Sequence, residues 1–373
     1  MTGALRLLAL LFIFVFALIR ETINACSFSA IFPSKILVQS WQDQKEKENE
    51  ERVPHYTPST LEDFVIANSN KYGMNATSIG TMQPMCTIME QSNAHELRRY
   101  LASLDTYNTM VENFIPLQED IRTMISRSGK SACEKLSLLK QNTSSNPFEP
   151  HQLSFSSTVG GLEPLLPPLR HPRFCEEGDS LIVDLSYLVH DFSTMCKTLK
   201  STSRTVFVDM GASLDFHGAD DMPAMYILKL YKKFGFHFDH IYAYEVTPKE
   251  PSQVFAKVPP EFLSAYHWIN IGVESDPKKT VNPLQMIADN FNEDDFIVVK
   301  LDIDTSSIEV PLAYQLLRDE RLAGLVDQFY FEHHVFLQEL TYAWGRTMGG
   351  SVSESLYLFQ SLREKGVGAH SWV

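Results

Sequence analysis

The sequence predicts an α/β fold in which residues 201–373 form a doubly wound, mostly parallel sheet and an earlier region is helical. After residue 200, short runs rich in β-branched and aromatic residues are separated by helix-like segments. Parallel strands need such crossover segments, which cover both faces of the sheet. Acidic residues follow several of the runs, at the edge where parallel sheets bind their ligands.

Residues 1–25 have the pattern of a secretory signal peptide or a short membrane anchor. Arg6 precedes an unbroken apolar run at 7–19, which is 13 residues long. A bilayer core needs about 20 apolar residues, whereas a signal peptide needs roughly 7–15. We therefore expect cleavage before Cys26 and residence in the secretory pathway, either in the ER or Golgi lumen or outside the cell. If this segment is not cleaved, it is the part of the chain that contacts a membrane.

Two further features agree with this route. Asn75 and Asn142 begin N-x-[ST] sequons, so we expect a glycoprotein. Four cysteines follow Cys26, and they allow three disulfide pairings that sequence alone does not separate. Buried free thiols are the alternative. The four lie at positions 86, 133, 175 and 196.

Two regions precede the α/β domain. Residues 26–140 are expected to be helical, because apolar residues between 97 and 125 recur mostly three and four positions apart. Residues 141–200 are expected to be a Pro/Ser-rich linker and a lead-in helix, since the six prolines between 147 and 172 exclude a long helix there.

The elements expected in residues 201–373 alternate regularly. Five runs are expected to be strands: 205–208, 240–244, 266–271, 296–301 and 324–331. Four segments between and after them are expected to be helices: 224–234, 283–291, 310–317 and 353–364. Residues 369–373 are apolar enough to form a last edge strand.

The charge of the chain excludes one class of partner. Its 373 residues include 32 Lys and Arg against 46 Asp and Glu, which gives a formal net charge of -14. A nucleic-acid-binding surface neutralises phosphates with basic residues, and here it would act against the field of the whole chain. We expect a small-molecule or glycan ligand and no nucleic acid.

Acids at four of the five strand ends are the candidate site residues. One such acid is usually a turn or cap residue, whereas four at one edge indicate a site. Glu245 lies on the strand after the Gly211 turn, where a carboxylate can accept both hydroxyls of a bound ribose. The strand-end residues are Asp209 with Gly211, Glu245, Asp302 with Asp304, and Glu332 with His333 and His334.

Three segments carry a resemblance to a known family. They are VDMGAS at 208–213, YAYE at 242–245 and VKLDID at 299–304. Together they resemble the class I S-adenosylmethionine-dependent methyltransferases, particularly the FkbM-type branch, over residues 200–370. The resemblance implies a Rossmann-like methyltransferase fold with S-adenosylmethionine as cofactor. It further implies that Asp209, Gly211 and Ser213 line the methionine side of the cofactor, that Glu245 holds the ribose, and that the Asp302 strand end faces the acceptor.

The remaining strand-end residues suggest acceptor chemistry. Asp302 and Asp304 stand two apart in what we expect to be extended chain, so their carboxylates would point the same way. With Glu332 from a neighbouring strand they could hold a divalent metal, and His334 bears the same relation to Glu332. His333 or His334 could instead be a general base or a hydrogen-bonded core histidine. Asp302, His333 and His334 are the catalytic candidates of an O-methyltransferase that acts on a hydroxyl or carboxyl group.

Two alternatives stay open. Asp302-Ile303-Asp304 is also the DxD arrangement of nucleotide-sugar glycosyltransferases, whose carboxylates bind a metal on the diphosphate. The turn after Gly211 lacks a second glycine until Gly218, so a cofactor-free, methyltransferase-like binding protein is the other alternative. The loop at 342–350 either covers an acceptor, on which Trp344 could stack, or is an ordinary surface loop.

Overall fold

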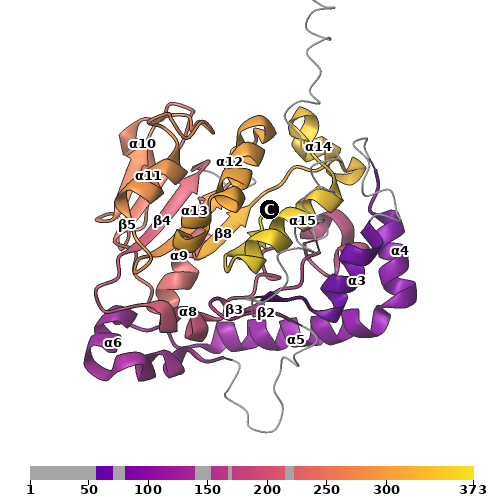
Figure 1. Cartoon of the computed structure of the whole chain (residues 1–373), viewed down its shortest axis with the longest axis horizontal. Coiled ribbons are helices and arrows are strands. Elements are labelled where there is room, and N and C mark those ends of the chain that lie inside the picture. The colour runs from indigo at the N-terminus through magenta and orange to yellow at the C-terminus, as the bar shows by residue number, and fades with distance from the viewer. Residues whose placement is uncertain (1–55, 70–79, 139–152, 167–169, 215–221) are drawn as a thin grey trace, which may run out of the picture. The chain divides into compact units, whose positions relative to one another are not determined.

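The computed structural model describes residues 56–69, 80–138, 153–166, 170–214 and 222–373, and the structural statements below concern these ranges (Figure 1). Residues Pro54–Val373 form one compact unit. The predicted signal segment, both sequons and Cys26 lie outside the described residues. None of the described helices is both long enough and apolar enough to cross a membrane.

A six-stranded, all-parallel sheet forms the C-terminal part of this unit, and it confirms the α/β class. In the sheet the strands lie in the order β6-β5-β4-β7-β8-β9, so the direction of winding reverses between β4 and β7. This order is typical of doubly wound sheets. In chain order the strands are β4 (Thr205–Met210), β5 (His240–Tyr244), β6 (Tyr266–Ile269), β7 (Phe296–Leu301), β8 (Gln328–Phe331) and β9 (Gly368–Ser371).

Helices cover both faces of this sheet. Right-handed connections that run in opposite directions along a sheet place their helices on opposite faces. The two connections from β4 to β6 contain α9 (Ala224–Lys233) and α10 (Pro251–Lys257). The connections from β6 to β9 contain α11 (Pro283–Asn290), α12 (Ser306–Arg318), α13 (Glu320–Leu325) and α15 (Val352–Glu364). α11, α12 and α13 contact one another, and α15 packs on α12 and β9, so β4 and β7 are buried along their whole length.

Several strand boundaries differ from the sequence prediction, and the strand expected at 205–208 continues to Met210 in β4. The run expected as a strand at 324–331 begins inside a helix, because Asp319 accepts hydrogen bonds from the backbone N–H groups of Arg321 and Leu322 and so caps α13. β8 therefore starts only at Gln328. The strand expected at 266–271 ends at Ile269. The last edge strand is present as β9.

The region before the parallel sheet consists of helices and a small antiparallel sheet. Its main helices are α3 (Thr60–Ser69), α4 (Gln83–Ser92), α5 (Ala94–Asn113) and α6 (Ile121–Ser128), followed by a 3-10 helix at Gly129–Leu136. Its strands are β1 (Tyr56–Thr57), β2 (Ser154–Ser156) and β3 (Gly160–Leu162), which pair in that order. The expected linker at 141–200 contributes β2, β3, α7 (Phe174–Glu177), a 3-10 helix at Gly178–Leu181, and α8 (Phe192–Thr198) to this same unit. Short helical turns after β8 are 3-10 helices at Gln338–Leu340 and Gly345–Thr347 and α14 (Thr341–Trp344).

The N-terminal helices contact the edge at which the strands begin. The guanidinium of Arg122, in α6, pairs with the carboxylate of Asp239 and donates to the carbonyl oxygens of Ser203 and His237. These three residues come just before β4 and β5. Figure 1 shows α5 and α6 along this edge. The opposite edge, where the strands end, is therefore left for a site.

Two disulfides tie the N-terminal helices to the segment before β4. Cys86 in α4 is bonded to Cys175 in α7, and Cys133 is bonded to Cys196 in α8. The bonded residues are 89 and 63 positions apart. In the chain-entropy account, each closure of this size stabilises the fold by about 4 kcal/mol. The pairing that the sequence left open is thus assigned, and two disulfides agree with an oxidising compartment.

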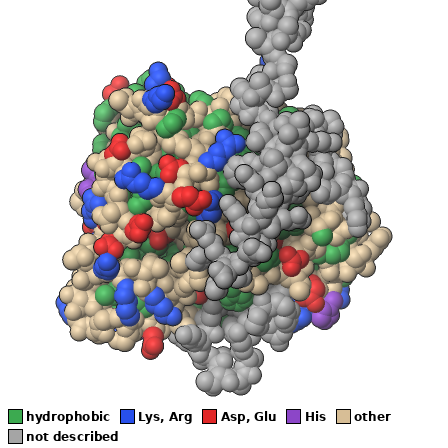
Figure 2. Space-filling model, viewed as in Figure 1, with side chains coloured by type: hydrophobic (Ala, Val, Ile, Leu, Met, Phe, Trp, Pro, Cys, Tyr) green, Lys and Arg blue, Asp and Glu red, His purple; other side chains and the backbone are tan. Residues whose placement is uncertain are grey.

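Acidic and basic side chains are mixed on the surface. Figure 2 shows both signs interspersed over the described part of one face. Exposed pairs such as Lys200 with Asp294 and Arg127 with Glu119 join them locally. Such pairs contribute at most about 1 kcal/mol each, so the stability of the fold must come from buried contacts.

A buried cation joins the small antiparallel sheet to the C-terminal strands. Arg363 in α15 is fully buried and lies 3.2 Å from Glu163 Oε1 and 3.7 Å from Glu62 Oε2. It also donates to the Tyr56 hydroxyl, at 3.1 Å, and to the Ala369 carbonyl in β9, at 2.9 Å. A buried charge is tolerated only when it is paired and hydrogen-bonded in this way. One side chain therefore connects α3, β1, the segment after β3, and β9.

We expect Arg363→Met to lower the free energy of unfolding by about 3–5 kcal/mol, because it leaves Glu62 buried without its cation and Glu163 with His370 as its remaining charged partner. Urea unfolding followed by circular dichroism measures the change. Arg127→Met is the matched control, since Arg127 is exposed and pairs only at the surface with Glu119, and we expect it to cost less than about 1 kcal/mol. Equal midpoints for the two variants would show that the Arg363 cluster is not a stabilising contact.

Candidate functional site

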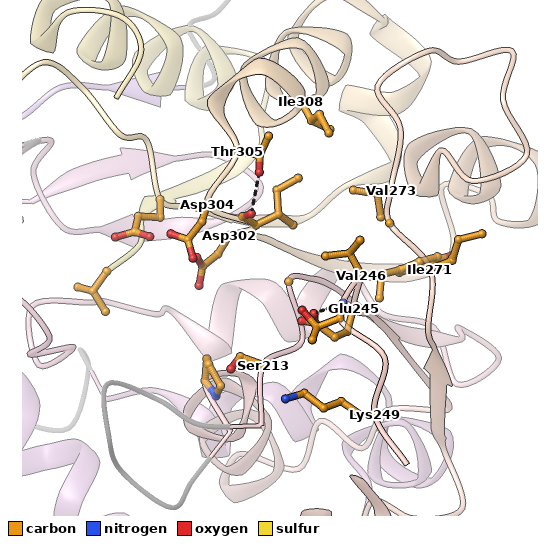
Figure 3. Close-up of a pocket in the computed structure, with 18 residues that line it drawn as sticks. Ser213, Glu245, Val246, Lys249, Ile271, Val273, Asp302, Asp304, Thr305 and Ile308 are labelled. Carbon is orange, nitrogen blue, oxygen red and sulfur yellow. Dashed lines mark hydrogen bonds between the residues drawn. The ribbon is translucent and has the colours of Figure 1, made fainter. Parts of the chain in front are cut away.

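A cavity of ≈ 510 Å³ lies at the carboxyl ends of the strands, where the strand order reverses. Ligands of doubly wound sheets bind at this position. Residues after β4, β5, β6, β7 and β8 all contribute to its wall (Figure 3). The structure thereby brings most of the predicted site residues together: Gly211, Ser213, Glu245, Asp302, Asp304 and Glu332 all line the cavity.

The turn after β4 requires glycine. Gly211 has a φ of +93°, and the backbone N–H groups of Gly211 and Ala212 both donate to the carbonyl of Tyr244, at 3.0 and 2.9 Å. A Cβ atom on Gly211 would lie 1.6 Å from the backbone oxygen of Asp302. No other residue fits so close an approach. The ends of β4, β5 and β7 therefore converge on one glycine at the floor of the cavity.

A buried lysine lies behind this turn. Lys300 is the register partner of Asp209 in the neighbouring strand, and its Nζ lies 3.2 Å from Asp209 Oδ1 and 3.0 Å from Asp302 Oδ2. Burial alone would lower the pKa of Lys300, but the two carboxylates raise it above its ordinary value. Asp209 pairs with Lys300 and does not line the cavity. Its placement differs from the cofactor contact that the family resemblance implied.

Asp302 differs from Asp209 because it faces the cavity. Burial raises the pKa of Asp302 to about 7, with Lys300 acting against the rise and Glu332 adding to it. A carboxyl group with such a pKa exchanges a proton near neutral pH. Asp302 is thus the best placed proton acceptor in the cavity wall.

Asp304 does not share the direction of Asp302, contrary to our expectation of an extended chain. Its φ is +56°, so the backbone turns between the two residues. The Asp304 side chain is 79% exposed and lies 3.6 Å from His334 Nε2, whereas the Asp302 carboxylate is held by Lys300. The predicted metal set of Asp302, Asp304 and Glu332 is corrected accordingly. The groups that could hold an ion together are Asp304, Glu332 and His334, whose ligand atoms all lie within 4.8 Å of one another.

The backbone between Asp302 and Asp304 is fixed by Glu309, in the first turn of α12. Its Oε1 accepts from the N–H of Ile303, at 2.7 Å, and its Oε2 accepts from the N–H of Thr305, at 3.1 Å. Glu309 is buried, and burial raises its pKa to about 8. This carboxylate shapes the acidic loop without reaching the cavity.

Glu332, at the end of β8, is held by several groups. His334 Nε2 lies 2.9 Å from its Oε2, Trp344 Nε1 donates to its Oε1 at 3.0 Å, and Arg170 lies 3.8 Å from Oε1. Although burial favours the neutral acid, these partners hold the pKa of Glu332 at about 2. The same carboxylate raises the pKa of His334 against the effect of burial. Trp344, which we considered as an acceptor cover, is instead buried and positions Glu332.

The two histidines lie outside the lining of the cavity. His333 stacks on Phe331 and donates from Nε2 to the carbonyl of Gly349, at 3.1 Å. Burial lowers its pKa to about 4, so it is neutral near pH 7. Because neither histidine lines the cavity, neither is placed to act as the general base that the sequence suggested. His334 acts on the cavity only through Glu332 and Asp304.

Glu245 is at the other end of the cavity. Its Oε1 accepts from the N–H of Thr247 at 2.6 Å, which orients the carboxylate. The side-chain amide of Asn270 donates to the backbone carbonyl oxygens of Glu245 and Thr247. Lys249 lines the same end, and Figure 3 shows its side chain directed toward Ser213. Exposed apolar side chains of Val246 and Ile271 form the adjacent wall.

Four residues important to the site were missed in the sequence. Lys300 had a signal, since it is the one polar residue in the run FIVVKL, and a buried charge implies acidic partners. The roles of Lys249, Glu309 and Arg170 could not be predicted from the sequence, because they depend on contacts that only the fold creates.

Comparison with models of known protein families, with curated proteins and with solved structures finds no match to this chain. The function must therefore be inferred from the cavity itself.

We expect Gly211→Ala to destabilise the protein and to abolish ligand binding in the cavity, because the new Cβ collides with the Asp302 backbone. Gly324→Ala is the matched control, since Gly324 lies in α13 with open space around the position of a Cβ. There the helix should gain about 0.5–1 kcal/mol. Thermal unfolding measures both, and a Gly211→Ala protein as stable as Gly324→Ala would contradict the close approach.

We expect the free energy of unfolding to fall as pH rises from about 5 to 8, because the pKa of Glu309 is raised in the folded state to about 8. The folded chain holds this proton more tightly than the unfolded chain, so the stabilisation is complete at low pH and is lost as pH approaches 8. In Glu309→Gln the slope should be shallower by at most about 1.4 kcal/mol per pH unit. Urea unfolding at several pH values measures it, with exposed Glu293→Gln as control; identical slopes in the two variants would refute the shift.

Proposed function

We propose that this chain is an S-adenosylmethionine-dependent O-methyltransferase of the secretory pathway, which acts on a hydroxyl or carboxyl acceptor, such as one on a glycan. The observation that carries the proposal is that the Gly211 turn and the Glu245 carboxylate, at the ends of adjacent strands, line one cavity. This is the pair of features that holds a nucleoside in doubly wound sheets.

The residues present fit that cofactor. The Gly211 turn places backbone and the Ser213 side chain in the cavity wall next to the end of the strand that leads to Glu245. Glu245 keeps acceptor capacity for ribose hydroxyls after accepting the Thr247 N–H. Val246, Ile271 and Val273 offer apolar surface on which a flat ring can pack. The cofactor, when bound, would supply an electrophilic methyl group on a sulfonium.

The chain's own groups at the other end suit an oxygen acceptor. Asp302 lines the cavity with a pKa of about 7, so its carboxylate can take the proton of an acceptor hydroxyl. Lys300 Nζ holds the Oδ2 of this carboxylate at 3.0 Å and so fixes its direction. Asp302 is therefore the proposed general base, and Lys300 is a positioning residue.

The glycosyltransferase alternative receives less support. A DxD pair needs two carboxylates that reach one metal, but Asp302 is engaged by Lys300 and Asp304 turns away toward His334. The binding-protein alternative has the same cavity but no catalysis. Methyl transfer to an acceptor would distinguish our proposal from it.

We expect S-adenosylhomocysteine to bind the purified chain, and Glu245→Gln to weaken binding by about 10- to 100-fold, since hydrogen bonds to a charged acceptor contribute about 1.5–3 kcal/mol. The amide keeps an oxygen for the Thr247 N–H but cannot accept both hydroxyls. Isothermal titration measures the affinity.

The matched control is Glu250→Gln, which removes the same charge from an exposed position outside the cavity lining. Its affinity should equal that of the native chain. Absence of binding to the native chain would refute the proposal, and a nucleoside diphosphate that binds with Mn²⁺ would favour the glycosyltransferase alternative. Equal affinities in the two variants would remove the ribose role of Glu245.

A further inference from the structure

His334 lies in a setting that requires a cation. The Thr347 hydroxyl donates to the carbonyl of Trp344, at 2.7 Å, so its oxygen must accept from His334 Nδ1–H, at 2.6 Å. In the neutral imidazole the second nitrogen, Nε2, then carries a lone pair. Its two neighbours are carboxylate oxygens, of Glu332 at 2.9 Å and of Asp304 at 3.6 Å. Three acceptors facing one point repel one another unless a positive charge lies between them.

The charges around His334 also indicate that a cation belongs at this position. Four carboxylates of the described residues are grouped here, and two permanently charged cations, Lys300 and Arg170, pair with them. Lys300 is shared between two of the four. The group therefore has excess negative charge, which is costly for its buried members. The four are Asp209, Asp302, Asp304 and Glu332.

We propose that Asp304, Glu332 and His334 bind one divalent transition-metal ion. Ligand atoms about 2.1 Å from an ion, at angles between 90° and tetrahedral, lie about 3.0–3.4 Å apart. The observed separations of 2.9 and 3.6 Å bracket that range. Imidazole with carboxylates suits Mn²⁺, Fe²⁺ or Zn²⁺. The Thr347 hydroxyl is the outer partner that a metal-binding histidine normally has.

The open coordination positions of this ion face the cavity. Asp304 and Glu332 line the cavity wall, whereas His334 lies behind it. An ion with three protein ligands keeps positions for water or for oxygens of a bound molecule. The site would then hold acceptors that offer two adjacent oxygens, such as a vicinal diol or a hydroxy acid. This last step rests on the proposed function, whereas the metal site itself does not.

The test is titration of the chelator-treated, full-length chain with Mn²⁺ alone at neutral pH, followed by electron paramagnetic resonance. We expect one tight site whose bound Mn²⁺ shows hyperfine coupling to a nitrogen. Asp304→Asn should weaken this site by at least about tenfold. That variant is expected to fold, because the side chain is 79% exposed and Asn tolerates a positive φ.

Asp289→Asn is the control, since it removes the same charge from an exposed position on α11 outside the cavity. It should leave the affinity unchanged, and His334→Gln should abolish the nitrogen coupling. No tight site in the native chain, or equal affinities in the two Asp variants, would overturn the proposal and leave a proton on His334 as the cation. Because the titration contains no S-adenosylhomocysteine, and that ligand is titrated without metal, failure of one proposal is distinct from failure of the other.

Discussion

The site depends on one buried ammonium group. Lys300 lies inside the sheet beside Asp209 in register and two residues before Asp302, which directly follows β7, and its ammonium lies close to both carboxylates. An unpaired ammonium at this depth would destabilise the fold by several kcal/mol. Removal of either acid would therefore destabilise it by part of that amount. The lysine therefore dictates that acids end both β4 and β7. It also holds the Asp302 carboxylate against the cavity, while Gly211 lets the two strand ends approach.

Many contacts from the rest of the described chain support the edge of the sheet where the strands begin, whereas Arg170 and Gly80 contact residues after β8 at the other edge. α6 bonds the segments before β4 and β5 through Arg122, and two disulfides and the Arg363 cluster hold the helices and the small sheet in place. These contacts lie at strand beginnings or behind α15. The carboxyl edge stays open, and its loops are fixed by local bonds such as those of Glu309 to the backbone of 303–305.

Sequence predicted the sheet well because its signals are local. The buried runs of β4 and β7 and the acids after them are visible in short windows, and convergence at one edge follows from parallel pairing. The boundary of β8 was wrong because the Asp319 cap was not recognised. The disulfide pairing needed the fold itself.

The roles of individual acids could not be predicted from spacing. Asp302 and Asp304 were assigned a common direction, yet the positive φ of Asp304 separates them, and Glu309 stabilises that turn from the next helix. Asp209 looked like a ligand contact until its register partner proved to be a buried lysine. A strand-end acid is informative about a site as a group, but its own role is set by the charge it faces.

The charge of the cavity bears on the choice between the two transferase classes. Among the residues that the structure describes, its lining includes four carboxylates, of Glu245, Asp302, Asp304 and Glu332, and a single cation, Lys249. A sulfonium ligand is positively charged and is favoured by such a field, whereas the diphosphate of a nucleotide sugar is repelled unless a metal neutralises the acids around it. With Asp302 already paired to Lys300, a metal on Asp304 and Glu332 would neutralise only the acceptor end. At the other end Lys249 offsets the charge of Glu245, so the negative field that favours a sulfonium over a diphosphate comes from the acids at the acceptor end and is strongest before a metal binds there.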